Sequence, residues 1–179
     1  MLLTGLLPDI TSDPAIETAT DSLEVGRSGT IVAPVGIRPP LLAAVASRAA
    51  TPLVVLTATG RDAETLTNAL ASWIPGVAML PAWETLPHER LSPQVDTMAR
   101  RIAVLRRLLH PIAGDESAGP ISVLVVPIRA FLQPIISGLA DLEPVRVRTG
   151  DILDLTETTN RLAELGYERV DMVEGRGQM

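Results

Sequence analysis

The stretch VAPVGIRPPLLAAVA, residues 32–46, has the layout of a phosphate-binding loop. A β-rich run, residues 30–35, leads into a short loop around Gly36, and an Ala-rich helical sequence follows at once. In such an arrangement the backbone N–H groups at the helix N-terminus point at a bound phosphate. Nucleotide binding is therefore the first chemistry to test against the residues of this loop.

The side chains of the loop do not suit that chemistry. A loop of the GxxxxGK[ST] type places a lysine on the β- and γ-phosphates and a hydroxyl on Mg²⁺. Here Pro39 and Pro40 stand at those positions, and proline has neither an N–H nor a side-chain donor. Arg38 is nearby, but a rigid guanidinium is a poor substitute for a compact ammonium group. Gly36, Arg38, Pro39 and Pro40 thus predict a degenerate loop that holds no cofactor and hydrolyses no ATP, with prolines that suit a first helical turn.

A second candidate is the segment PAWETLPHERLSP, residues 81–93, which follows a predicted strand. Ligand sites of α/β proteins lie beyond strand ends of this kind. One interpretation is an acid–base pair formed by His88 and Glu89. The other is a rigid loop in which Trp83 fills the core and Glu84, His88, Glu89 and Arg90 order the chain. The second is favoured, because no nucleophile elbow, metal-ligand spacing or glycine-rich dinucleotide fingerprint accompanies the pair.

The predicted helix over residues 93–110 carries a cluster of arginines. Its apolar face is predicted to hold Val95, Met98, Ile102, Leu105 and Leu109. The other faces carry Arg100, Arg101, Arg106 and Arg107, and Asp96 is placed to pair with Arg100. These arginines form either a basic patch for nucleic acid or a protein, or a solvated helix face. The acidic balance of the whole chain favours the solvated face.

The composition argues against several classes of protein. A net charge of −6 and only 2% aromatic residues do not suit a nucleic-acid-binding surface. The chain has no cysteine and two histidines, which excludes a disulfide framework and gives no recognisable metal cluster. No apolar run approaches the roughly 18 residues that a membrane span needs, and the first residues lack the basic region of a signal peptide. We expect a soluble, cytoplasmic protein.

The alternation of elements predicts an α/β fold with a parallel, P-loop-like sheet. Strands are expected at 30–35, 52–58, 77–82 and 121–127, and helices at 14–23, 39–50, 61–73 and 93–110. After about residue 136 the pattern changes to a predicted half-exposed antiparallel strand, 145–149, and a helix, 156–167, that ends at Gly166. The predicted units are an N-terminal helical segment, 1–26, an α/β domain, 27–136, and an incomplete smaller α+β domain, 137–179.

The block LPAWETLPHERLSPQVDTMARRIAVLRRL closely resembles the amino-terminal module of the bacterial transcription-repair coupling factor (Mfd) family. VLVVPIRAFLQ and GYERVDMVEGRGQ also match that family, so the resemblance runs from about Arg27 to Gln178. The family's module is similar to the excision-repair protein UvrB. The resemblance implies a fold that has kept the architecture of an ATP site and lost its chemistry.

The resemblance also implies a function. The family is an ATP-driven DNA translocase that displaces stalled RNA polymerase and recruits UvrA for nucleotide-excision repair. Its motor domains, which use ATP and Mg²⁺ and bind double-stranded DNA, would lie outside these 179 residues, leaving this chain a non-catalytic docking and autoregulatory module. Contact with UvrA is implied for Tyr167 and Arg169 of the Y-[RE]-[RH]-V-D segment, and for Arg176. The family pattern continues with a further arginine-containing strand beyond Met179, whose position usually holds an aromatic residue.

Two alternatives remain open at this stage. One is an enzyme domain that binds a nucleotide through the atypical loop with help from Arg38. The other is a module that contacts DNA through the arginines of residues 93–110. A nucleotide-dependent rise in melting temperature would favour the first, and binding that weakens steeply with salt would favour the second.

Overall fold

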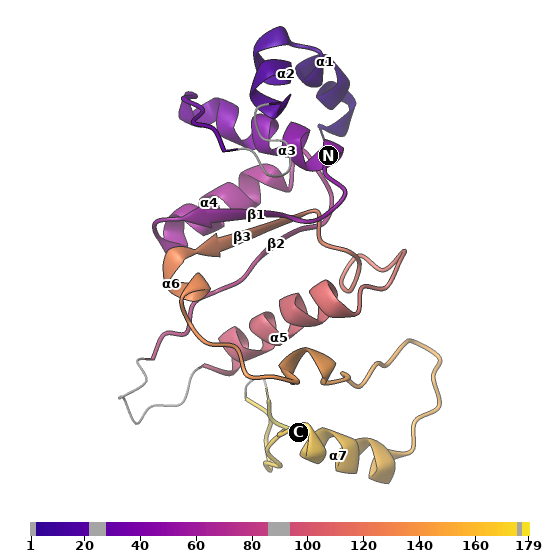
Figure 1. Cartoon of the computed structure of the whole chain (residues 1–179). Coiled ribbons are helices and arrows are strands. Elements are labelled where there is room, and N and C mark those ends of the chain that lie inside the picture. The colour runs from indigo at the N-terminus through magenta and orange to yellow at the C-terminus, as the bar shows by residue number, and fades with distance from the viewer. Residues whose placement is uncertain (1–2, 22–27, 86–93, 175–176) are drawn as a thin grey trace.

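The computed structural model describes residues 3–21, 28–85, 94–174 and 177–179 (Figure 1). Its α-helices are α1 (Leu7–Thr11), α2 (Pro14–Asp21), α3 (Arg38–Arg48), α4 (Gly60–Leu70), α5 (Val95–Leu109), α6 (Ile128–Phe131) and α7 (Leu155–Glu164). Its strands are β1 (Leu53–Thr57), β2 (Val77–Met79) and β3 (Val123–Pro127), and 3₁₀ turns occur at Thr4–Leu6, Val35–Ile37 and Leu139–Asp141. None of the described helices is both long enough and apolar enough to cross a membrane.

The three strands form a parallel sheet in the order β1-β3-β2. Leu53 of β1 and Val77 of β2 both lie opposite Val123 of β3. Every residue of the central strand β3 is buried, as its continuous apolar sequence predicts. The strands predicted at 52–58, 77–82 and 121–127 are therefore confirmed in type, and so is the mixed α/β class.

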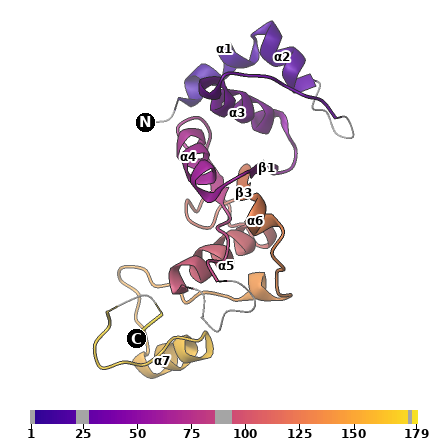
Figure 2. The same cartoon turned by 90° about the vertical axis from the view of Figure 1, so that its left-hand side faces the viewer.

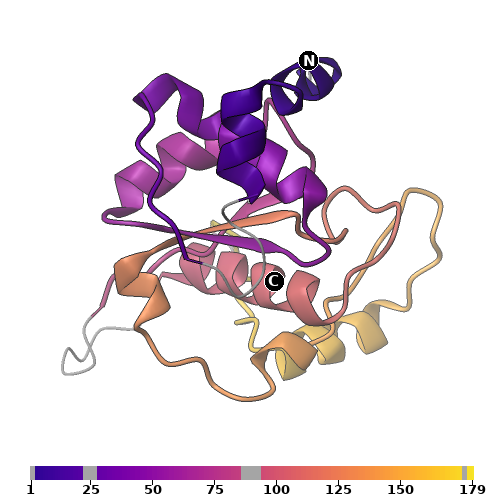
Figure 3. The same ribbon diagram turned by 45° about the horizontal axis from the view of Figure 1, so that its top comes forward.

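Helices cover both faces of this sheet (Figure 3). Side chains alternate along β3, so Val123 and Val125 face α3 and α4, whereas Leu124 and Val126 face the opposite side. The first core joins the strands to α3 and α4 through Ala43, Ala46, Ala63, Leu70 and Ile74. The second core includes Val104 of α5 and the residues Ala78, Leu80, Ile121 and Ala130. The two cores fix the ends of the strands, where the candidate sites lie.

The prediction of a strand at residues 30–35 was wrong. Residues 28–34 form no regular element, and Val35 begins a 3₁₀ turn that leads into α3. Val32 and Val35 are 95% and 72% exposed, so neither contributes to the core. The β-branched sequence favours an extended chain, but a strand also needs a neighbour to pair with. In the described part of the chain no strand pairs with this segment.

The first part of the region after residue 136 packs against α5 (Figure 2). The turn Leu139–Asp141 packs on α5, and α7 lies at the end of the molecule away from α1 and α2. α7 begins where Asp154 accepts a hydrogen bond from the backbone N–H of Glu157, and Gly166, with φ of +85°, follows its end as predicted. The prediction of a strand at 145–149 was wrong, because residues 146–149 are exposed and the segment has no strand partner among the described residues.

The amino-terminal helix α2 begins as predicted from its sequence. The Asp13 carboxylate accepts a hydrogen bond of 2.8 Å from the backbone N–H of Ala15. Arg48 at the end of α3 donates to the Thr20 hydroxyl and pairs with Asp21, which ties α2 to α3. The division into units at residues 26 and 136 stays a prediction.

Candidate functional site

The predicted phosphate loop lies at the start of α3. Gly36 is in the 3₁₀ turn without a positive φ, and Arg38 is the first residue of α3. Pro39 stands in the first helical turn and Pro40 is buried, so both prolines serve the helix start as predicted. Since residues 30–35 are not a strand of the sheet, the loop does not follow a strand end. At residues 36–40 the structure thus lacks the strand–loop–helix geometry that places backbone N–H groups around a phosphate.

A cleft of about 530 Å³ lies instead at the carboxyl ends of the three strands. The segments after β1 and β2 turn to opposite faces of the sheet, which is where open α/β sheets place ligands. Its charged lining residues are Glu64, Glu84, Asp96, Arg100 and Arg129. None of the four loop residues lines this cleft. The lining carries three carboxylates and two guanidiniums, so its charge does not select a single class of ligand.

Glu84 in this cleft has a structural role. Its carboxylate accepts a hydrogen bond from the Thr97 hydroxyl in the first turns of α5. This hydrogen bond is the main reason why the pKa of Glu84 is below its usual value, and desolvation opposes it. Arg129 donates to the backbone carbonyl of Glu84. The segment after β2 is thereby fastened to the start of α5, as expected for a rigid loop.

The prediction that Trp83 fills the core was wrong. Its ring is half-buried and lies under the guanidinium of Arg101, which is 4.5 Å from the ring centroid. Arg101 is only 1% exposed and donates a hydrogen bond of 2.6 Å to the carbonyl of Pro81. Burial lowers the pKa of Arg101. Arg101 was predicted on a solvated or basic face, yet it shares the buried face of α5 with Thr97, four residues earlier, and Val104, three residues later.

The other arginines of α5 do not form a uniform basic patch either. Arg100 pairs with Asp96 at 2.8 Å, which confirms the predicted pair. Arg106 donates to the carbonyl of Leu142, and Arg107 donates to the carbonyl of Gly119. The apolar face of α5 is also shifted, because Val95, Met98 and Leu109 are exposed while Val104 and Leu105 are buried. Three of the four arginines therefore hold other parts of this chain.

The predicted partner residues lie in the last described part of the chain. The backbone N–H of Glu168 donates to the carbonyl of Gly177, and the N–H of Val170 donates to the carbonyl of Met179. Tyr167 and Arg169 flank Glu168, which forms an isolated bridge with Gln178. Arg169 is exposed, and among the described residues it has no hydrogen bond or ion pair, so the pairing with Glu168 or Asp171 that would make it a simple surface arginine is not formed.

Three predicted residues of the 81–93 segment, His88, Glu89 and Arg90, lie outside the described residues, as does Arg176. Their proposed roles stay predictions. The helix start expected at residue 93 lies there too, and α5 is described from Val95.

Comparison with known proteins shows that this chain has relatives in sequence. The chain is 46% identical over 151 residues to the transcription-repair-coupling factors of Mycobacterium bovis and Mycobacterium tuberculosis, covering 83% of this chain. The chain is related to the transcription-repair-coupling factors. The protein of that name from Escherichia coli is 26% identical over 140 residues, or 77% of this chain. These matches confirm the resemblance seen in the sequence.

The related region is a small part of each relative. The chain spans 12% of the length of the transcription-repair-coupling factors that it matches. No protein-family model matches the chain. The names of these relatives indicate roles in DNA repair and transcription coupling for those proteins.

Proposed function

We propose that this chain is a non-catalytic, UvrB-like docking module of a transcription-repair-coupling factor, and that it binds UvrA. The exposed, unpaired guanidinium of Arg169 carries the proposal. An exposed arginine without a partner in its own chain is available for a bidentate bond to a carboxylate of another protein. Arginine and tyrosine are also enriched among the residues that dominate binding energy at protein interfaces.

The surroundings of Arg169 hold it in position for such a contact. The backbone N–H of Tyr167 donates to the carbonyl of Leu162 at the end of α7, and the Tyr167 side chain, two residues before Arg169, is 40% exposed. Hydrogen bonds to residues 177–179 fix the backbone on the other side. A preordered backbone lowers the entropy lost on binding. Tyr167 supplies apolar area and Arg169 supplies charge, and a role for Arg176 stays a prediction.

We infer the wider role from the relatives. In a full-length protein the module would work beside ATP- and Mg²⁺-dependent motor domains that move along double-stranded DNA and displace stalled RNA polymerase. Docking UvrA would recruit nucleotide-excision repair, and contact with the motor would allow autoregulation. The activity of the whole protein and its place in the cytoplasm belong to this proposal.

Titration of purified UvrA into this chain by calorimetry tests the docking role. We expect Arg169→Glu to weaken binding at least tenfold, because charge reversal places two carboxylates against each other. Arg61→Glu is the matched control, since Arg61 is exposed on α4 and forms no ion pair in the described structure. Equal binding by wild type and Arg169→Glu would remove Arg169 from the interface. Failure of the wild-type chain to bind would reject UvrA docking by these residues.

A further inference from the structure

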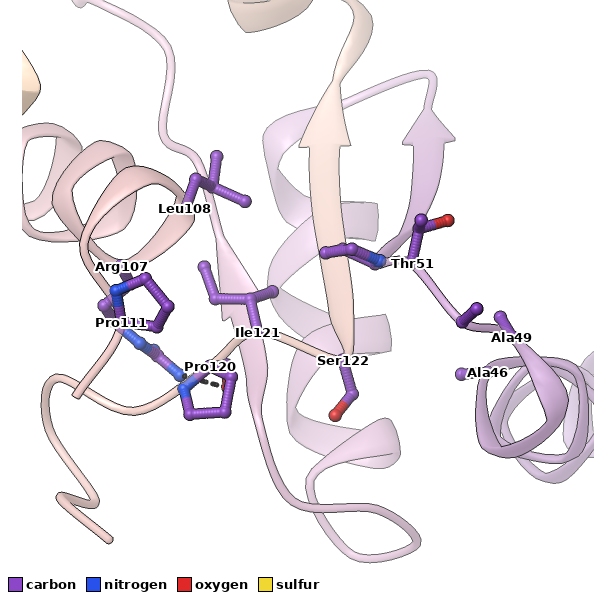
Figure 4. Close-up of a pocket in the computed structure, with 11 residues that line it drawn as sticks. Ala46, Ala49, Thr51, Arg107, Leu108, Pro111, Pro120, Ile121 and Ser122 are labelled. Atoms are coloured by element: carbon purple, nitrogen blue, oxygen red, sulfur yellow. Dashed lines mark hydrogen bonds between the residues drawn. The ribbon is translucent and has the colours of Figure 1, made fainter. Parts of the chain in front are cut away.

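A second cavity lies at the opposite edge of the sheet, at the amino ends of the strands (Figure 4). It has a volume of about 380 Å³, within the range of pockets that hold small ligands. Ala46 and Ala49 at the end of α3 form one wall, and Leu108 of α5 and Ile121 form the other. Thr51 and Ser122, which precede β1 and β3, add two hydroxyl groups.

Arg107 is the charged residue in the lining of this groove. Its Nε donates to the carbonyl of Gly119 at 2.8 Å, and its Nη2 reaches the carbonyl of Pro120 at 3.5 Å, at the limit of a hydrogen bond. Within the part of the chain that the structure describes, no carboxylate lies within ion-pair distance of Arg107. Partial burial lowers the pKa of this guanidinium. Arg107 is partly buried and has only carbonyl partners among the described residues, so an anion in the groove would be the first group to pair with its positive charge.

The rest of the groove limits what kind of anion fits. Eight of its eleven lining residues are apolar, which suits an aliphatic body attached to the anionic group. α3 and α5 both end at this edge, and the partial negative charge of helix C-termini opposes a dianion such as a phosphate monoester more strongly than a single carboxylate. The last carbonyls of a helix lack partners within it and accept N–H groups. A single carboxylate, an aliphatic side chain and a nearby N–H occur together at the carboxyl terminus of a peptide.

We propose that this groove binds the carboxyl-terminal end of a peptide whose last residue is aliphatic, with the terminal carboxylate on Arg107. This site shares no residue with the surface formed by Tyr167 and Arg169 and does not depend on the UvrA proposal. The partner is thus a protein with an exposed apolar C-terminus.

The test uses two probes, acetyl-Ala-Val-Leu with a free carboxylate and the same peptide as a C-terminal amide. Binding to the whole chain is followed by NMR through the backbone amides of Leu108, Ile121 and Ser122. We expect saturable shifts with the acid and at least tenfold weaker binding of the amide, because the amide removes the charge that Arg107 would pair. Equal binding of acid and amide, or no saturable shift at millimolar peptide, would overturn the proposal.

Variants of the groove separate binding from folding. Ala49→Phe fills the groove from an exposed position and should abolish the shifts, whereas Ala71→Phe, at the exposed end of α4, should leave them unchanged. Arg107→Gln should reduce binding of the acid to that of the amide. Because Arg107 also holds Gly119, Ala49→Phe keeps the test valid if Arg107→Gln fails to fold. Undiminished binding by Ala49→Phe would place the peptide elsewhere and contradict the proposal.

Discussion

Arg100 and Arg101 are neighbours on α5 with opposite surroundings. Arg100 is exposed and pairs with Asp96 one helical turn away, whereas Arg101 is buried between the carbonyl of Pro81 and the ring of Trp83. The buried guanidinium joins α5 to the end of β2, so its contribution comes from packing and cation–π contact as well as from charge. Its Nε has no hydrogen-bond partner among the described residues, which offsets part of that gain.

We expect Arg101→Ala to lower the free energy of unfolding by roughly 2–3 kcal/mol, because it removes a desolvated cation–π contact and a hydrogen bond from a charged donor. Arg100→Ala removes an exposed pair with Asp96 and should cost no more than about 0.5 kcal/mol. Urea denaturation of both variants measures the difference. Equal losses would show that burial does not distinguish the two arginines.

Asp115 gives a pH dependence that the structure assigns to one carboxylate. It accepts hydrogen bonds from the hydroxyl and N–H of Ser117 and the N–H of Ala118, and it pairs with Arg146. The Ser117 hydroxyl is the leading cause that lowers the pKa of Asp115 to about 2. The folded pKa lies below the value of about 3.9 for a free aspartate. The stability gained is therefore present above about pH 4 and is lost as the pH falls toward 2.

Asp115→Asn should lower stability at neutral pH and flatten the dependence of stability on pH between about 4 and 2. Glu116→Gln is the control, since Glu116 is exposed and forms no side-chain hydrogen bond among the described residues. Thermal melts of the three proteins across this pH range provide the measurement. A wild-type profile that matches Asp115→Asn would assign the acid sensitivity to other carboxylates.

At the level of elements, the pairing of residues 168–170 with 177–179 depends on Gly177. Gly177 has φ of +82°, and a Cβ placed there would lie 2.9 Å from a methyl group of Val95 at the start of α5. The close approach shows that this pair of segments is seated on the first turn of α5. A side chain at residue 177 would meet both backbone strain and a clash.

We expect Gly177→Ala to expose the backbone N–H of Val170, which donates to the carbonyl of Met179, to faster hydrogen exchange. Gly150→Ala is a matched control, because Gly150 also has a positive φ, of +95°, but open space around its Cβ position. Val95→Ala added to Gly177→Ala should restore part of the protection by removing the clash. If Gly150→Ala changed the exchange at Val170 as much as Gly177→Ala, the contact with Val95 would not matter.

Elements with strong local signals were predictable from sequence, and those that depend on distant contacts were not. The continuous apolar run of β3 and the Asp154 and Gly166 signals around α7 give their elements directly. The run 30–35 has the same β-branched character, yet it lacks a strand to pair with in the described structure.

Of the candidate site residues, Tyr167 and Arg169 were named through the family resemblance. The role of Arg101 was missed, because its polar side chain is stabilised by a carbonyl and a ring far along the sequence.

At the level of the whole molecule, the net charge and the contacts of the arginines both bear on whether the chain binds nucleic acid. The chain has a net charge of −6, and all of its basic residues are arginines. On α5, Arg101, Arg106 and Arg107 donate to backbone carbonyls of three different segments. Arginines used in this way fasten the sheet, the loop before β3 and the segment after the 3₁₀ turn at Leu139–Asp141 to one helix. Of the four arginines of α5, Arg100 is the exposed one that could neutralise a phosphate.

We therefore expect no measurable binding of this chain to a 20-base-pair DNA duplex at about 0.15 M salt, because nonspecific DNA affinity comes from neutralised phosphates and counterion release. Fluorescence anisotropy with labelled duplex is the measurement, repeated at about 0.05 M salt, where electrostatic binding is strongest. Arg100→Glu serves as the paired variant, since Arg100 is the exposed arginine of the four. Binding that falls steeply with salt and is lost in Arg100→Glu would restore the DNA-contacting interpretation. Absence of binding at both salt concentrations would leave α5 as the element that joins the two ends of the molecule.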